Sequence, residues 1–319
     1  MNDVRDPVIY DPTVTVVRFT DDLAPATTLA TLVNWASHPE YTGRQNNRMT
    51  ADYVHALRRT LEQGDPATAT PGLGGTAVFI QGPLGGQIGP GGPVAPLDSA
   101  GNPVIDDGLP KAEAAGRSVA LLALDAIGGA AEVAGETDLE YRTAEIFVRV
   151  ENRALQLANT LGVLQRELYL YDTALPPAPD NVPYVRSRVT FLRVGPLGLV
   201  TAPGELHPEL WVGGYDGSWS WGRPILTETE NAPDLDDAPN PPYLRDVLLD
   251  TPGVEYAFVA GLGEDWLGYI IPEFNFVIPE DNPYLEEADG DHYEETYSVG
   301  PLGEEQMFLP MVRLVRYQP

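Results

Sequence analysis

The stretch TLATLVNWASHPEYTGRQNNRMTADYVHALRRTLEQ, residues 28–63, decides the fold class. Its first nine residues, 28–36, form a dense apolar run that predicts a buried strand. A helix is predicted over about 51–63, with Thr50 as a plausible N-cap and Gly64 as its end. The helix carries an apolar stripe made of Val54, Leu57 and Leu61. A buried strand that leads into an amphipathic helix is typical of a layered domain.

The neighbouring segments continue this alternation. A strand is predicted at 13–19 before the stretch, and a short buried strand at 76–82 after it. A second helix is predicted from about 111 to 127, opened by Pro110 and ended by two glycines. The order strand, helix, strand, helix predicts an α/β fold in which a mixed β-sheet is layered with helices.

The second half of the sequence is predicted to be richer in strands, with one short helix at 152–161. The strands are predicted at about 144–150, 166–172, 185–194, 197–202, 254–260 and 307–317. Long loops rich in Pro, Gly and Asp separate them, and loops of this length are usually functional or mobile. These loops are 173–184, 228–243 and 278–291. No linker forces a domain boundary, so residues 1–319 are expected to form a single domain.

The charge balance narrows the possible partners. The chain has 19 Lys and Arg against 47 Asp and Glu, a formal net charge of −28. Nucleic acid is excluded as a partner because phosphate binding needs a positive surface, and an anionic membrane would be repelled unless a local patch compensated. No apolar run is long enough to span a bilayer. Acid-rich loops could hold Ca²⁺ or Mg²⁺ as a structural ion, although no EF-hand spacing is present.

The chain contains no cysteine, which excludes disulfides, thiolate zinc sites and cysteine nucleophiles. A transition metal would therefore need His, Asp, Glu or Tyr as ligands. Only four histidines are available for this role. They are His38, His55, His207 and His292.

Two of these histidines directly follow predicted buried strands, where ligand sites collect in open α/β sheets. His38 precedes a proline at the end of the strand 28–36, although a lone histidine there is more often structural. Glu205 and His207 follow the strand 197–202 and a Pro-Gly turn, and both could reach one metal ion. Equally, Glu205 could cap a helix that starts after this turn.

Two glycine-rich segments are further candidates. Tyr269 lies in the stretch VAGLGEDWLGYIIPEFNF, 259–276, where aromatic residues are more often packing than catalytic. Gly85 and Gly86 lie in QGPLGGQIGPGGP, 81–93, a turn whose backbone N–H groups could stabilise an oxyanion. This turn matches neither a dinucleotide fingerprint nor a Walker A loop. No G-x-S-x-G motif is present, which excludes an α/β-hydrolase serine triad.

Taken in order, these segments resemble neutral ceramidases and their bacterial relatives. The resemblance runs from about residue 4 to 302. It rests on an N-F-x-x-H-P strand end, paired Asn, a T-A-D-Y helix start, an A-V-F-x-x-G strand, a P-G-E turn, a G-L…G-Y segment and a late Y-E…S-x-G-P stretch. The matching residues are Asn34 to Pro39, Asn46-Asn47, Thr50 to Tyr53, Ala77 to Pro90, Pro203 to Glu205, Gly261-Leu262 with Gly268-Tyr269, and Tyr293 to Pro301.

The resemblance implies a zinc-dependent amidohydrolase that cleaves the amide bond of an N-acyl sphingolipid-like substrate by metal-activated water. It places His38, Glu205 and Tyr269 among the zinc ligands, and Tyr269 could also donate a proton to the oxyanion. It further implies a bacterial, secreted or periplasmic protein, although this chain shows no signal peptide. The chain would then be the later part of a catalytic domain.

Two features depart from the family pattern. The other zinc histidine of the family lies in an upstream S-H-T-H-S-G-type motif, which this chain lacks. The family's catalytic serine is also missing, because the turn reads Gly82-Pro83-Leu84-Gly85-Gly86. A companion N-terminal chain could supply the missing ligand, or His207 could join Glu205 and His38 in a rearranged metal site. A non-catalytic relative that binds a lipid or a partner chain is the alternative function.

Overall fold

The computed structural model describes residues 5–87, 95–130, 133, 137–175, 178, 180–227 and 229–317. The chain divides into two compact units, which the polypeptide enters more than once. Unit 1 is built mainly from Pro12–Gly82 and Gln87–Ala134, and unit 2 from Asp3–Asp11, Pro83–Gly86 and Gly135–Pro319. That these units act as one catalytic domain stays a prediction.

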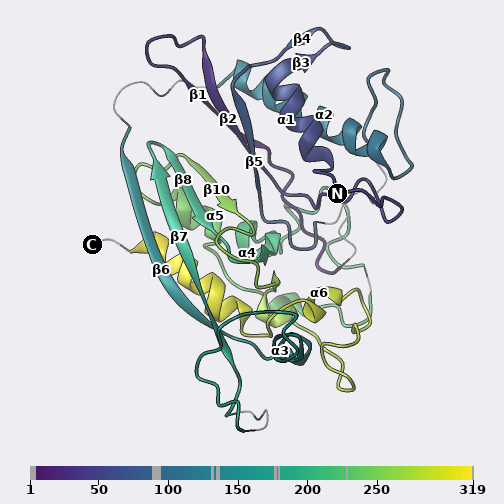
Figure 1. The fold of residues 1–319 in the computed structure, drawn as a ribbon, viewed down its shortest axis with the longest axis vertical. Coiled ribbons are helices and arrows are strands. Elements are labelled where there is room, and N and C mark those ends of the chain that lie inside the picture. The colour runs from purple at the N-terminus through teal and green to yellow at the C-terminus, as the bar shows by residue number, and fades with distance from the viewer. Residues whose placement is uncertain are drawn as a thin grey trace. The chain divides into compact units, whose positions relative to one another are not determined.

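Unit 1 is a three-stranded mixed sheet with two helices packed against it (Figure 1). Strand β2 lies in the middle, antiparallel to β1 and parallel to β5. The strands are β1 (Thr15–Thr20), β2 (Thr28–Trp35) and β5 (Thr76–Gln81), and the helices are α1 (Tyr53–Gln63) and α2 (Leu109–Gly128). Two short strands, β3 (Gly64–Asp65) and β4 (Thr70–Pro71), follow α1.

The core of unit 1 contains the apolar stripe predicted for the first helix. Leu57 and Leu61 are fully buried against the sheet and α2. The N-cap differs from the prediction by two residues: the side chain of Asp52, not Thr50, accepts the hydrogen bond from the backbone N–H of Tyr53. Asp52 is favoured because its carboxylate also accepts from two other backbone amides, whereas the Thr50 hydroxyl only accepts from the amide of Asp52.

Unit 2 contains a four-stranded mixed sheet in the order β10-β8-β7-β6 (Figure 1). β7 is antiparallel to both of its neighbours, and β10 is parallel to β8. The strands are β6 (Leu139–Arg149), β7 (Tyr184–Val194), β8 (Leu197–Thr201) and β10 (Tyr256–Ala260). Helices α5 (Leu244–Leu249) and α7 (Leu309–Arg316) bury apolar residues against this sheet.

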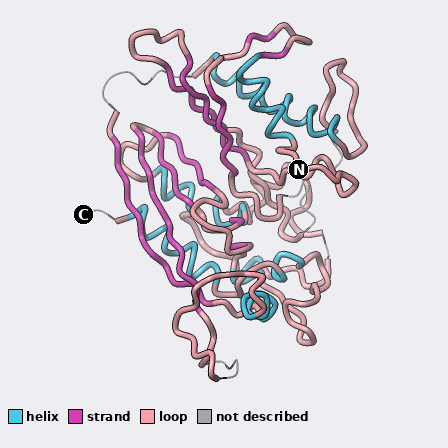
Figure 2. The backbone as a smooth tube through the Cα atoms, in the orientation of Figure 1, coloured by secondary structure: helices cyan, strands magenta, loops and turns pink. Residues whose placement is uncertain are grey.

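Shorter elements and long loops complete unit 2, as Figure 2 shows. Two short parallel strands, β9 (Glu205–Leu206) and β11 (Tyr269–Ile270), pair with each other. The remaining helices are α3 (Arg153–Thr160), α4 (Pro208–Val212), α6 (Tyr293–Thr296), the 3₁₀ turns Leu235–Asp237 and Glu273–Asn275, and the π-helical turn Glu304–Phe308. No helix in the described residues is long and apolar enough to cross a membrane.

The α/β fold with a mixed sheet is confirmed, but two predicted strands are wrong. Residues 307–317 form the end of the π-helical turn and α7. The buried residues Met307, Met311 and Val315 recur every four positions, which is a helical spacing. The segment 166–172 makes only one isolated bridge, from Tyr169 to Tyr184, among the described residues, because the positive φ of Leu170 interrupts an extended chain.

Candidate functional site

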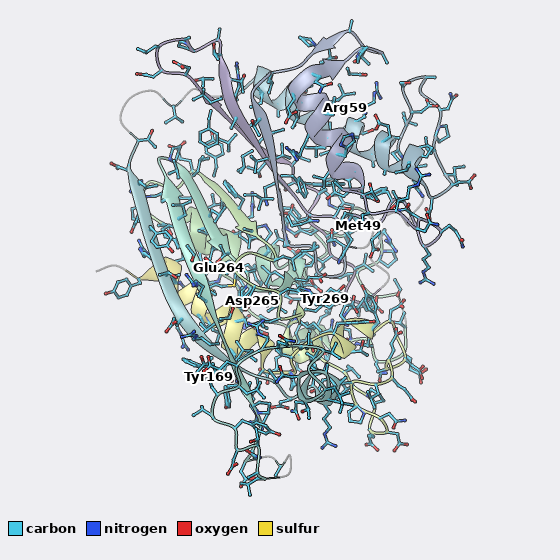
Figure 3. All side chains as sticks on the ribbon, in the orientation of Figure 1. Met49, Arg59, Tyr169, Glu264, Asp265 and Tyr269 are labelled. Carbon is cyan, nitrogen blue, oxygen red and sulfur yellow. The ribbon has the colours of Figure 1, made fainter. Side chains whose placement is uncertain are left out.

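Two of the predicted site residues, Glu205 and Tyr269, lie opposite each other in the small sheet of unit 2. The parallel register of β9 and β11 pairs Tyr269 with Glu205. Register partners on neighbouring strands point to the same side of a sheet, so the carboxylate and the phenol share one face. Figure 3 labels Tyr269 within unit 2.

Glycine makes this close pairing of strands possible. A Cβ added at Gly204 would lie 2.3 Å from the carbonyl oxygen of Gly268. Gly268 itself has φ +83°, and its Cβ would lie 1.8 Å from the carbonyl oxygen of Tyr297. Only glycine fits at either position, which explains why both candidate segments carry glycine directly before the functional residue.

Glu205 is buried and held by an indole. Its Oε1 accepts a hydrogen bond of 2.9 Å from Nε1 of Trp266, and its backbone N–H donates to the carbonyl of Gly268. Its side chain is only 7% exposed. The alternative that Glu205 caps a helix is wrong, because α4 begins at Pro208, after His207 as its N-cap, and Glu205 lies in a strand.

Tyr269 is a buried phenol that keeps its proton. Burial, the neighbouring hydroxyl of Tyr293 and the charge of Glu205 all raise the pKa of Tyr269 well above its ordinary value. The hydroxyl oxygens of Tyr269 and Tyr293 lie 3.4 Å apart. A neutral phenol in this position can donate a hydrogen bond to a carbonyl oxygen or an oxyanion.

His207 joins the same cluster. It is 1% exposed, and its ring lies edge-on to that of Tyr269 with centroids 6.0 Å apart. Its Nε2 is buried without a hydrogen-bond partner among the described residues. Its Nδ1 lies 3.7 Å from Oε2 of Glu209, a buried oxygen that has no hydrogen-bond partner in the described part of the chain.

The glycine turn of unit 2 packs directly on His207. A Cβ added at Gly85 would lie 2.5 Å from Cδ2 of His207, and the amide of Gly85 donates a 2.9 Å hydrogen bond to the carbonyl of Leu206. The Gly85 amide is therefore already used, and the predicted oxyanion donor that remains is the amide of Gly86, which has φ +70°. The rest of the glycine-rich stretch, residues 88–93, lies outside the described residues.

His38 belongs to unit 1, where it follows the end of β2. Its Nδ1 lies 3.1 Å from the carbonyl oxygen of Gln87. A carbonyl oxygen can only accept, so Nδ1 carries a proton in this contact. Metal-binding histidines commonly donate one ring N–H to a backbone carbonyl in this way and bind the metal through the other nitrogen. The predicted set of His38, Glu205 and Tyr269 draws on both units and stays a prediction.

The acidic residues beside Tyr269 are structural anchors. Glu264 accepts a hydrogen bond from Thr190, and Asp265 forms an ion pair with Arg166. Figure 3 labels the two acidic residues. Asp265 also accepts a hydrogen bond from Ser187, and because Ser187 and Thr190 lie on β7, both carboxylates hold the glycine-rich loop on the large sheet of unit 2. Across the residues that the structure describes, no three His, Cys, Asp or Glu side chains gather closely enough to hold a metal ion.

Sequence reasoning missed a buried ionic cluster next to the site. Arg5 pairs with Glu294 and Glu295, and all three are almost fully buried. Burial raises the pKa of Glu294, although the positive charges of Arg5 and His207 act in the opposite direction and lower it. Burial also disfavours the charge of Glu295, but hydrogen bonds from His292 and Arg5 lower its pKa to about 2. The sequence signal was the Tyr293-Glu294 pair of the late motif, but Arg5 lies 289 positions away from Glu294, so no local pattern links the two.

Comparison with known proteins supports the fold. No protein-family model matches the chain, and no curated protein matches it. The structure of neutral ceramidase from Pseudomonas aeruginosa matches with a TM-score of 0.58 and 15% identity, over 96% of this chain and 46% of that one. A structure described as ceramidase complexed with C2 matches with a TM-score of 0.59 and 14% identity, over 96% and 47%. This chain therefore has the fold of these ceramidases over about half their length.

Proposed function

We propose that this chain is a ceramidase-like hydrolase that cleaves the amide bond of an N-acyl lipid-like substrate with the help of zinc. The observation that carries the proposal is the pairing of Glu205 with Tyr269 on β9 and β11, both buried and on one face. The sequence resemblance assigns these two residues to the zinc site. The likeness in fold to ceramidases over 96% of the chain supports the same reading.

Each residue has a role in amide hydrolysis. Water adds to the carbonyl carbon, the C–N bond breaks, and the amine leaves with a proton, giving a fatty acid and an amine. The neutral hydroxyl of Tyr269 donates a hydrogen bond to the carbonyl oxygen as negative charge develops there. Glu205, held by Trp266, would provide a carboxylate ligand to zinc. Bound zinc would polarise the carbonyl and lower the pKa of water.

The charge of the protein fits a substrate without negative charge. With a formal net charge of −28, the surface repels anionic ligands and favours neutral or cationic ones. An N-acyl sphingoid base is neutral, and its amine product is cationic. The single-residue test of the site is therefore best made with a neutral amide.

The test compares fatty-acid release from a fluorescent N-acyl sphingosine by the zinc-loaded parent chain and by variants. Tyr269→Phe removes only the hydroxyl and should lower kcat/KM by about 10²- to 10³-fold, the usual effect of losing one oxyanion donor. Tyr297→Phe is the matched control because Tyr297 is 56% exposed, and it should leave the rate unchanged.

Two results would contradict the proposed function. If Tyr269→Phe and Tyr297→Phe hydrolysed the amide equally fast, the assignment of Tyr269 would be wrong. If the zinc-loaded parent released no fatty acid, the alternative of a non-catalytic lipid-binding relative would replace the hydrolase. Binding of the same fluorescent lipid, followed by anisotropy, would then measure that function.

A further inference from the structure

We propose that the end of α3 and the turn after it form a docking surface for a lipid bilayer without net charge. The docking surface is made of Leu157, Leu161, Val163 and Leu164. The proposal rests on the lipid-like substrate of the proposed function and deepens it, because a substrate of that kind is held in a bilayer until an enzyme takes it up.

The apolar side chains at the end of α3 are exposed to solvent. None of the α3 residues, all of which are described, is buried, and Leu155 packs only partly against the core of unit 2. The four side chains of the docking surface are between 36% and 75% exposed. Single exposed apolar residues are common, but a group of them in one place marks a surface that contacts something else.

The chain after α3 folds back onto the helix and gathers these side chains. The amides of Val163 and Leu164 donate hydrogen bonds of 2.9 and 3.1 Å to the carbonyl oxygen of Ala158. Gly162 has φ +75°, a conformation that glycine adopts without strain, and it reverses the chain at this point. The docking surface is therefore the compact end of one helix and not a set of scattered side chains.

The charge of this segment differs from that of the whole chain. Residues 154–165 contain no charged side chain, whereas the chain has a formal net charge of −28. Over residues 153–175, two basic and two acidic side chains balance each other. A segment without net charge fits the headgroups of zwitterionic lipids, whereas anionic lipids would repel the acidic remainder of the chain.

The size of the docking surface favours a bilayer over a second protein. A stable protein interface uses about 20–30 residues on each side. Four side chains fall far short of this number. Membrane binding, in contrast, strengthens with the apolar area that enters the boundary between headgroups and acyl chains, so a small apolar surface already contributes.

Hydrogen bonds tie the docking surface to the loop that carries the candidate site. Arg166, two positions after Leu164, donates hydrogen bonds of 2.8 and 2.6 Å to the two carboxylate oxygens of Asp265. The next residue, Trp266, is exposed, and its indole N–H donates to Glu205. Tryptophan is enriched at membrane interfaces because its ring has an apolar body and a polar end. The docking surface and the site thus lie on neighbouring segments, which suits an enzyme that takes its substrate from a bilayer.

The experiment attaches a polarity-sensitive fluorophore to the full chain. Because the chain contains no cysteine, Val163→Cys provides a single attachment point on the docking surface. Leu285→Cys is the matched control, since Leu285 is an exposed leucine in another loop of unit 2. On addition of phosphatidylcholine vesicles, the fluorophore at Val163→Cys should shift its emission to shorter wavelength and be quenched by spin-labelled lipids. The fluorophore at Leu285→Cys should show neither change.

Flotation of the unlabelled chain with vesicles measures the affinity. Replacing both Leu161 and Val163 by serine should weaken binding to phosphatidylcholine vesicles at least about 10-fold, because the apolar area is lost. Leu285→Ser should bind as the parent does. Vesicles that contain phosphatidylserine should bind the parent more weakly, and tighter binding to them would overturn the choice of an uncharged bilayer.

Three results with the labelled chain would overturn the docking surface. These are no response to vesicles, an equal response at Val163→Cys and Leu285→Cys, or a shift at Val163→Cys that appears without vesicles as protein concentration rises, which would assign the surface to a second copy of the chain. Hydrolysis of a water-soluble short-chain N-acyl amide tests the proposed function separately. A parent that hydrolyses this amide but does not bind vesicles would overturn the docking surface alone, whereas one that binds vesicles but hydrolyses no amide would overturn the proposed function alone.

Discussion

The contact between the two helices of unit 1 allows one stability prediction to be worked out from the coordinates. Gly116 lies in the middle of α2, where a Cβ would stand 2.1 Å from the carbonyl oxygen of Tyr53 and 2.8 Å from the backbone nitrogen of Leu57. Both atoms belong to the backbone of α1, so no side-chain rotation relieves the clash. Gly116→Ala therefore forces the helices apart.

Two effects of opposite sign determine how much Gly116→Ala changes the free energy of unfolding. Alanine in a helix interior is favoured over glycine by about 1 kcal/mol. Overpacking a well-packed core costs about 1–3 kcal/mol, and the rigid backbone partner places this case at the upper end. The net expectation is a loss of about 2 kcal/mol in the free energy of unfolding. Gly128→Ala is the matched control in the same helix, since no atom lies within 4 Å of its added Cβ.

Urea unfolding followed by circular dichroism, with hydrogen exchange of peptides from α1 and α2, measures the difference within unit 1. Gly128→Ala should be unchanged or more stable by up to about 1 kcal/mol. If Gly116→Ala were as stable as Gly128→Ala, the close approach of the two helices would be refuted.

Two further predictions concern unit 2. Gly85→Ala would push its Cβ into the side chain and backbone of His207, and overpacking of this kind costs about 1–3 kcal/mol in the free energy of unfolding; a Gly85→Ala variant that is as stable as the parent in urea unfolding would contradict the packing of this turn on the imidazole. Glu295 has a folded pKa of about 2 against an ordinary value of 4.5, so its ionised form stabilises the protein above pH 4.5, and this stability is lost as the pH falls toward 2. Glu295→Gln should therefore flatten the loss of stability in this range, as measured by urea unfolding at several pH values, whereas a steeper loss in the variant would contradict the prediction.

Local patterns predicted most of the fold. The apolar run at 28–36 predicted β2, and the helical spacing of Leu57 and Leu61 predicted α1. In both segments the local sequence pattern determines which side chains are buried. The C-terminal segment was predicted to be a strand because the four-residue spacing of Met307, Met311 and Val315 fits both the two-residue period of a strand and the 3.6-residue period of a helix. Only packing against the large sheet of unit 2 selects the helix.

The candidate site could be predicted only in part. Glu205, His207 and Tyr269 each follow a glycine-containing turn at a strand end, which is a signal visible in the sequence. The pairing of β9 with β11 and the contact of Gly85 with His207 join segments that are far apart in the chain, so no local pattern reports them. Glu209 was missed for a different reason: a glutamate in the first turn of a helix ordinarily indicates a favourable charge at the helix start.

The activity that we propose is hydrolysis of an amide by means of a metal bound beside Glu205 and Tyr269. The most direct test is a zinc titration of the chelator-treated chain in which fatty-acid release from the N-acyl sphingosine is measured at each addition. The rate is expected to rise in proportion to bound zinc and to level off at about one zinc per chain. A rate that stays at the background value at every zinc concentration, or one that is the same with and without zinc, would contradict the claim.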